Sequence, residues 1–223
     1  MMWVKICANT NLKDAQLSAE LGADAVGFVF ARSVRQVDVQ QVAAMTSQLP
    51  PGVERIGVFA GGDPNWVADA ALESGLHSIQ MHGGLDLKWA TQLRSIVPNE
   101  IALIHTVHWV VGEDEASERA VREQLLALAG AGLGERVLID AKIGATSGGL
   151  GVRFDWTRAK TVLDEAAVGL RVIVAGGLRS ENVAEAVSTL APYGVDVASG
   201  VEGTPGEKDP EKLRQFIDNA RRA

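Results

Sequence analysis

The sequence predicts a (β/α)8 barrel, the architecture known as a TIM barrel, formed by one domain over residues 1–223. Short β-branched runs alternate along the chain with segments of helical apolar spacing, and about eight such pairs fit its length. The alternative is a doubly wound open sheet, which would need a glycine-rich nucleotide fingerprint after its first strand. Residues 7–10 read Cys-Ala-Asn-Thr and contain no glycine, so the barrel is favoured.

The first half of the chain reads as a series of strand-and-helix pairs. Its first helix has a candidate cap at Thr10 or Asn11, apolar positions at helical spacing and a stop at Gly22. The other elements rest on short β-rich runs or on 3.6-residue spacing. The predicted strands are residues 3–7, 25–30, 55–60 and 78–82, and the further predicted helices are 39–49, 64–74 and 85–96.

The second half continues the alternation and ends in a helix. Ser180 has the character of an N-cap before the apolar residue Val183, so we place the start of a helix there. The predicted strands are residues 101–108, 136–140, 171–174 and 195–197, and the further predicted helices are 113–129, 157–167 and 210–222.

The last two strands are each followed by small residues whose backbone amides are uncovered. In a (β/α)8 barrel the loops after these strands form the usual phosphate site, because exposed N–H groups and a helix N-terminus converge there. Either loop alone is explained as a simple chain turn, but two such loops in adjacent units favour anion binding. The predicted phosphate-binding residues here are Gly176, Gly177, Ser199 and Gly200.

A third glycine-rich loop, residues 148–151, follows the strand that ends at Asp140. Its glycines would let backbone amides wrap the same phosphate, which adds Gly149 and Gly151 to the predicted phosphate-binding residues. A merely mobile surface loop is nearly as well supported by composition alone.

Composition and charge narrow the class of protein. Hydrophobic residues make up 47% of the chain, which supports one large core, and the net charge of −7 argues against a broad nucleic-acid surface. The apolar runs are shorter than the ~20 residues that cross a membrane, and no signal-peptide segment is apparent. A single cysteine excludes an internal disulfide. We therefore expect a cytoplasmic protein with neither nucleic-acid nor membrane partners; whether it is a monomer or a homodimer stays open.

Catalytic side chains in this fold lie at the carboxyl ends of the strands, which draws attention to Cys7 and Asp140. Cys7 shares strand parity with Lys5, so both side chains would face the barrel interior. The competing explanation for Cys7 is a small core residue. Asp140 ends an apolar run, and its competing roles are a helix N-cap or a solvated loop acid.

The candidate substrate ligands at the same end of the barrel are Lys5, Arg35 and His82. Arg35 follows the second strand, and its guanidinium group would hold a carboxylate through two parallel hydrogen bonds. Arg32 in the same loop could do the same, and the alternative for both residues is a solvated position on the surface. His82 would donate to substrate from a strand end. The four histidines do not show metal-ligand spacing, and no Cys/His cluster occurs, so no catalytic metal is predicted.

Taken in order, these segments resemble the phosphoribosylanthranilate isomerases of tryptophan biosynthesis. Each motif alone is weak, but the ordered set spans the whole chain and is specific. The matching segments are residues 5–7 (KIC), 33–37 (SVRQV), 79–83 (IQMHG), 138–140 (LID), 148–151 (GGLG), 154–156 (FDW), 175–177 (AGG), 195–202 (VDVASGVE) and 205–209 (PGEKD).

The resemblance implies a cofactor-free Amadori rearrangement of a small phosphorylated substrate, N-(5-phosphoribosyl)anthranilate. It assigns the acid role to Asp140 and the base role to Cys7. Ring opening needs a proton on the furanose oxygen, and the next step removes a proton from the adjacent sugar carbon. Asp140 should then have a pKa above about 3.9, and Cys7 a pKa below about 8.5 with help from Lys5. Arg35 would hold the anthranilate carboxylate.

The chain departs from the family pattern at several positions. Ala8 stands where the family usually has glycine, Leu150 where a threonine or serine is usual, and His105 where a lysine is common. None of them replaces Cys7 or Asp140, so we expect activity, with either reduced efficiency or an altered substrate range.

Three rival functions remain to be weighed. The histidine-pathway isomerase, which runs the same rearrangement on a larger bis-phosphate, would need an aspartate in place of Cys7 and a second phosphate loop. Indole-glycerol-phosphate synthase would need a catalytic lysine pattern and an extra N-terminal helix. A non-catalytic barrel that binds a phosphorylated metabolite has only Ala8 and Leu150 in its favour, and fold alone does not establish function.

Overall fold

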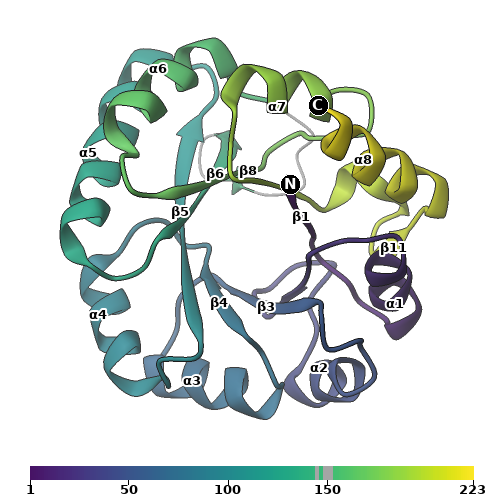
Figure 1. Cartoon of the computed structure of the whole chain (residues 1–223). Helices are drawn as coiled ribbons and strands as arrows, with labels where there is room; N and C mark the ends of the chain where they lie inside the picture. The colour runs from purple at the N-terminus through teal and green to yellow at the C-terminus, as the bar shows by residue number, and fades with distance from the viewer. Residues whose placement is uncertain (144–145, 148–152) are drawn as a thin grey trace.

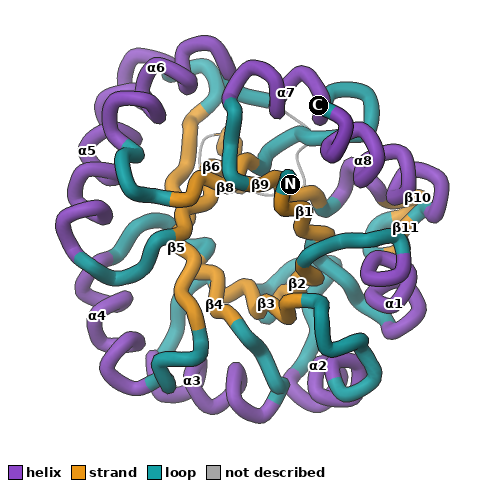
Figure 2. The backbone as a smooth tube through the Cα atoms, in the orientation of Figure 1, coloured by secondary structure: helices purple, strands orange, loops and turns teal. Residues whose placement is uncertain are grey.

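Parallel strands form a closed ring in the computed structural model, which describes residues 1–143, 146–147 and 153–223 (Figures 1 and 2). Around the ring the strands follow the order β5-β4-β3-β2-β1-β9-β8-β6, and the β5–β6 pairing closes it. The strands are β1 (Trp3–Ile6), β2 (Ala25–Val29), β3 (Glu54–Phe59), β4 (Ser78–Met81), β5 (Ala102–Val110), β6 (Arg136–Ile143), β8 (Arg171–Val174) and β9 (Gly194–Val197). The predicted (β/α)8 barrel is confirmed.

Helices form an outer layer around this ring (Figure 2). Most of them begin at an Asn or Asp whose side chain accepts a hydrogen bond from a first-turn amide. The helices are α1 (Leu12–Glu20), α2 (Val39–Thr46), α3 (Pro64–Glu73), α4 (Leu87–Ile96), α5 (Asp114–Ala131), α6 (Trp156–Ala166), α7 (Val183–Leu190) and α8 (Pro210–Arg222). No helix in the described ranges is both long and apolar enough to cross a membrane.

The start of α7 differs from the predicted one. The helix begins at Val183 with Asn182 as its N-cap, so Ser180 is not the cap. Asn182 accepts a hydrogen bond from the Arg179 amide at 2.8 Å and donates to the Gly177 carbonyl at 3.0 Å. These two bonds stabilise a turn that delays the helix by two residues.

Additional short elements surround the carboxyl ends of the strands. The strand β7 (Thr146–Ser147) pairs antiparallel with β6, which itself extends beyond the predicted strand. A 3-10 helix, η1 (Ser199–Val201), leads into the hairpin β10 (Glu202–Thr204) and β11 (Glu207–Lys208). This hairpin lies beside α1 (Figure 2), and the backbone amide of Lys208 donates a hydrogen bond to Oδ2 of Asp14 on α1.

The barrel interior is apolar at its amino-terminal end and polar at its mouth. Six apolar side chains fill the lower layer: Trp3, Ala25, Ile56, Ile104, Leu138 and Ile173. Side chains two positions further along the same strands lie one layer higher, since alternate residues share a face. In that layer Lys5, Thr106, Asp140 and Asp196 are all buried. Polar groups are therefore concentrated where a ligand would enter.

Candidate active site

A cavity of about 310 Å³ opens at the carboxyl ends of the strands. It is lined by most of the predicted site residues, which come from β6 and from the segments that follow β1, β2, β4, β8 and β9. These residues are Cys7, Arg35, His82, Asp140, Gly176, Gly177, Ser199 and Gly200. The cavity thus brings together residues separated by nearly the whole chain.

Lys5 lies beneath the cavity and is fully buried. Its Nζ donates to Oε1 of Gln80 at 2.7 Å and lies 3.0 Å from Oδ1 of Asp196. Gly27 makes room for this arrangement, because a Cβ there would lie 2.8 Å from Sγ of Cys7 and 2.9 Å from Cε of Lys5. The predicted neighbour relation between Lys5 and Cys7 is therefore present, but Lys5 supports the site from below.

The protonation of Cys7 differs from the expected one. Burial raises the pKa of the Cys7 thiol, and the charge of Lys5 only partly opposes it, while Asp196 raises it further. For Lys5 burial alone would lower the pKa, but Asp196 and Cys7 outweigh it and the pKa is raised. The expectation of a depressed Cys7 pKa is wrong, because the thiol is buried and the Lys5 cation beside it is shared with the Asp196 carboxylate.

The pKa of Asp140 is shifted in the expected direction, upward. Burial, followed by the negative charge of Asp196, raises the pKa of the Asp140 carboxyl to about 7. Its Oδ2 lies 3.6 Å from Nε2 of His82. Burial, with repulsion from His108 and Lys5, lowers the pKa of His82 to about 4. His82 is therefore uncharged at neutral pH, and the carboxyl beside it remains partly protonated.

His108 holds the backbone and ring of His82 in place. Its Nε2 donates to the His82 carbonyl at 3.1 Å, and the two rings pack edge to face with centroids 5.4 Å apart. The neighbouring strands β5 and β6 pair His108 with Asp140 in register. His105 points elsewhere, toward the carbonyl of Leu133, and does not line the cavity.

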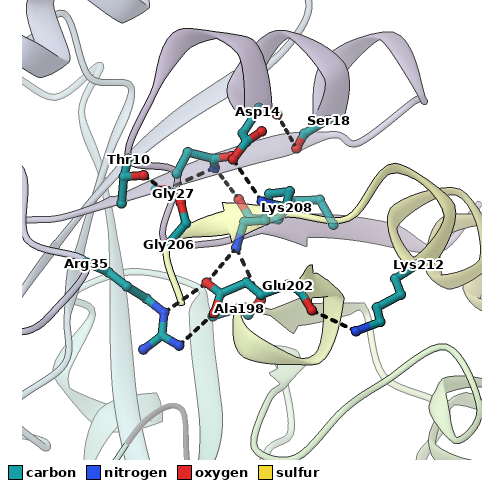
Figure 3. Close-up of polar contacts among 12 residues, drawn as sticks. Thr10, Asp14, Ser18, Gly27, Arg35, Ala198, Glu202, Gly206, Lys208 and Lys212 are labelled. Carbon is teal, nitrogen blue, oxygen red and sulfur yellow. Dashed lines mark hydrogen bonds and ion pairs between the residues drawn. The ribbon is translucent and has the colours of Figure 1, made fainter. Parts of the chain in front are cut away.

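Arg35 lines the cavity but is already engaged by a carboxylate of the protein. Its Nε and Nη2 donate to the two carboxylate oxygens of Glu202 at 2.8 and 2.7 Å (Figure 3). Burial alone would raise the pKa of Glu202, but the hydrogen bonds from Arg35 and the charge of Lys208 hold it below its usual range. The guanidinium is thus fixed before any ligand binds.

Two of the three predicted phosphate loops lie at the cavity wall. Gly176 and Gly177 have φ angles of 82° and 68°, which favour glycine. A Cβ on Gly176 would collide with the Ala141 backbone, and one on Gly200 with the Leu178 carbonyl. The loops are therefore packed so closely that only backbone can face the ligand there. Gly149, Gly151 and Leu150 lie outside the described residues.

Several residues of the site were not predicted from the sequence. Asp196 had a usable signal, since it is a carboxylate inside the β-branched strand β9, with its side chain on the interior face. Gln80 lines the cavity, and Gln80, Glu202 and Lys208 all stand within segments that carry the family resemblance, but no local pattern gives them a role. Over the described ranges, no group of three or more His, Cys, Asp and Glu residues could hold a metal ion.

Comparison with known proteins gives a consistent result. Residues 4–219 match the family model described as N-(5'phosphoribosyl)anthranilate (PRA) isomerase. An N-(5'-phosphoribosyl)anthranilate isomerase from Citrifermentans bemidjiense is 38% identical over 223 residues, covering 100% of this chain and 98% of the relative.

Solved structures resemble the chain over its whole length. The crystal structure of phosphoribosyl anthranilate isomerase from Thermotoga maritima has a TM-score of 0.83 and 33% identity, with 100% of both chains covered. A second crystal structure, of the same type of isomerase in complex with reduced 1-(o-carboxyphenylamino)-1-deoxyribulose 5-phosphate, has a TM-score of 0.80 and 32% identity, again with 100% of both chains covered.

Proposed function

Since the chain belongs to the N-(5'-phosphoribosyl)anthranilate isomerase family, we propose that Cys7 and Asp140 carry out the proton transfers of its reaction. The protein is an aldose–ketose isomerase of tryptophan biosynthesis. It converts N-(5'-phosphoribosyl)anthranilate into 1-(2-carboxyphenylamino)-1-deoxyribulose 5-phosphate by an Amadori rearrangement. The observation that carries the assignment is that Cys7 and Asp140 line one cavity at the barrel mouth.

Asp140 acts as the general acid in this proposal. Its protonated carboxyl gives a proton to the furanose ring oxygen while the bond from that oxygen to the anomeric carbon breaks, and the nitrogen lone pair forms a Schiff base. A carboxyl with a pKa of about 7 is still partly protonated at neutral pH, as this step requires. Neutral His82, 3.6 Å away, leaves that proton in place without adding a cation that would favour ionisation.

Cys7 acts as the general base in the following step. Its thiolate removes the proton from the sugar carbon next to the Schiff base, and the electrons of that bond neutralise the nitrogen to give an enolamine, which then tautomerises to the ketone product. Because burial raises the pKa of Cys7, the form with Asp140 protonated and Cys7 ionised is a minor species in the free protein. The buried Lys5 cation supports the thiolate when it forms.

Remote parts of the substrate are held by other residues in this proposal. The amides around Gly176, Gly177, Ser199 and Gly200 bind the phosphate, and Arg35 binds the anthranilate carboxylate. A related isomerase has been solved with a phosphorylated compound that carries such a carboxyl group, which supports this class of ligand. Binding energy from both ends would position the sugar between Asp140 and Cys7.

Steady-state kinetics of conservative variants test the proposal. Cys7→Ser and Asp140→Asn should each lower kcat by about 10²–10⁴-fold while still binding the reduced product analogue. Asp218→Asn serves as a control, because Asp218 lies on the outer helix α8 and contacts Arg222. Turnover close to wild type in Cys7→Ser or Asp140→Asn removes that residue from the mechanism. Growth rescue of a tryptophan auxotroph that lacks the isomerase gives an independent readout.

A further inference from the structure

A buried chain of polar contacts leads from Arg35 to the C-terminal hairpin (Figure 3). Arg35 follows β2, whereas its partner Glu202 begins β10, 167 residues further along the sequence. Both oxygens of Glu202 accept from the guanidinium. The Glu202 side chain is 5% exposed and that of Arg35 is 18% exposed. Such a two-point contact fixes the plane of the guanidinium as well as its position.

Lys208 also holds the carboxylate of Glu202, at the same oxygen that accepts from Nε of Arg35. The Lys208 side chain is fully buried, and its Nζ lies 3.3 Å from Oε1 of Glu202 and 3.1 Å from the Ala198 carbonyl. The backbone amide of Lys208 donates to Oδ2 of Asp14 on α1 at 2.8 Å. Lys212 on α8 donates to the Glu202 carbonyl at 2.8 Å. The backbone of the hairpin that carries Glu202 and Lys208 is therefore anchored to α1 and α8.

The arrangement matters because Arg35 lies on an otherwise exposed loop. Arg32, Ser33 and Val34, which precede it, are all exposed. A free arginine side chain loses about 2 kcal/mol of rotamer entropy when it is ordered. Glu202 orders the Arg35 side chain before substrate binds, because it accepts hydrogen bonds from Nε and Nη2. Within the described part of the chain, Nη1 of Arg35 has no hydrogen-bond acceptor. One edge of the guanidinium is thus held by the protein while the other remains for a ligand.

We propose that Glu202 is a positioning residue for recognition of the substrate carboxylate, and that it acts by presenting Arg35 to the cavity. Lys208 links this pair to the proposed phosphate site, because its Nζ contacts both Glu202 and the carbonyl of Ala198. Ala198 directly precedes the proposed phosphate-binding residues Ser199 and Gly200. The carboxylate clamp and the phosphate loop are thereby joined through one buried side chain. This inference rests on the proposed role of Arg35.

Binding of two probes separates this role from a general structural one. The probes are the reduced product analogue and the same compound without its ortho carboxylate, titrated into the full-length protein. Wild type should prefer the first. Glu202→Gln, which keeps the size of the side chain but loses one acceptor, should reduce that preference about tenfold or more, while binding of the carboxylate-free probe changes little. Glu207→Gln is the matched control, because Glu207 lies on the same hairpin, is exposed, and accepts a hydrogen bond from the Thr204 hydroxyl.

Three comparisons decide the outcome. Arg35→Ala should lose the preference as well, and adding Glu202→Gln to it should have no further effect on the preference. If Arg35→Ala loses the preference and Glu202→Gln keeps it, the positioning role is wrong and the clamp stands; if Arg35→Ala also keeps it, both are wrong. Glu202→Asp, which restores the charge on a shorter side chain, should recover part of the preference. Equal weakening of both probes in Glu202→Gln and Glu202→Asp would indicate a purely structural role and overturn the proposal.

Discussion

Oδ2 of Asp140 lies 3.6 Å from Nε2 of His82, and burial acts on both groups in the same sense, toward the uncharged form. The pKa of Asp140 is raised to about 7, while that of His82 is lowered to about 4. Between these two values the pair consists of a neutral imidazole and a largely protonated carboxyl. The contact is therefore not an ion pair at neutral pH, and its chemistry is that of a proton donor held next to an uncharged ring.

The order of these pKa values predicts the pH profile of catalysis. Activity needs Asp140 protonated and Cys7 ionised, but the pKa of Cys7 is raised and lies above that of Asp140. For such reversed protonation kcat/KM rises with pH up to about 7, then stays level, and falls only where Cys7 itself ionises. In Asp140→Asn the rise should instead continue to the pKa of Cys7. A wild-type profile that declines just above pH 7 would contradict this order.

Asp140 should also make stability depend on pH. Its pKa is higher in the folded protein, about 7, than in the unfolded chain, about 3.9. The stabilisation from this group is therefore fully present below pH 4 and is lost as pH rises through 7, by up to about 4 kcal/mol. Asp140→Asn lacks this loss, so its free energy of unfolding relative to wild type should increase from pH 4 to pH 8. Urea titrations at both pH values measure it, with Asp218→Asn as the control; an unchanged difference would mean that folding does not raise the pKa of Asp140.

The sequence located the catalytic candidates because their placement follows from local pattern. A residue that ends a parallel strand must lie at the barrel mouth, so Cys7 and Asp140 were identified without knowledge of distant contacts. The Arg35–Glu202 pair joins residues 167 apart and depends on how the final hairpin folds back, which no local pattern encodes. The raised pKa of Cys7 likewise depends on burial and on the three-dimensional position of Asp196.

Asp196→Asn should shift two titrations in the same direction. The negative charge of Asp196 raises the pKa of both Cys7 and Asp140, so its removal makes both groups ionise more readily. Asparagine can still accept a hydrogen bond from Lys5. Alkylation of Cys7 by iodoacetamide should therefore shift to lower pH, together with the ascending limb of kcat/KM. Asp218→Asn should move neither profile, and a shift of only one would show that Asp196 does not act through its charge.

Ala8 adopts a backbone conformation that favours glycine, with a φ of 60°. A left-handed conformation costs a residue with a Cβ about 1–2 kcal/mol, and the greater chain entropy of glycine offsets about half of that. Ala8→Gly should therefore raise the free energy of unfolding by up to about 1 kcal/mol. Ala191→Gly, at a φ of 46° at the end of α7, should behave alike. Ala175→Gly should be destabilising, since Ala175 is buried and is not among the positive-φ residues. Destabilisation of Ala8→Gly in thermal or urea unfolding would contradict this account.

Gly27 provides the space in which Cys7 and Lys5 lie side by side. A Cβ at this position would lie 2.8 Å from Sγ of Cys7, 2.9 Å from Cε of Lys5 and 3.2 Å from the Cα of Cys7. Gly27→Ala must displace at least one of these side chains, and overpacking of this kind costs about 1–3 kcal/mol. Because the displaced atoms include the proposed base, kcat should fall along with stability. Gly52→Ala is the matched control, since nothing lies within 4 Å of its Cβ position. If Gly27→Ala retains wild-type kcat and unfolds like wild type, the close packing of Cys7 and Lys5 is not needed for catalysis.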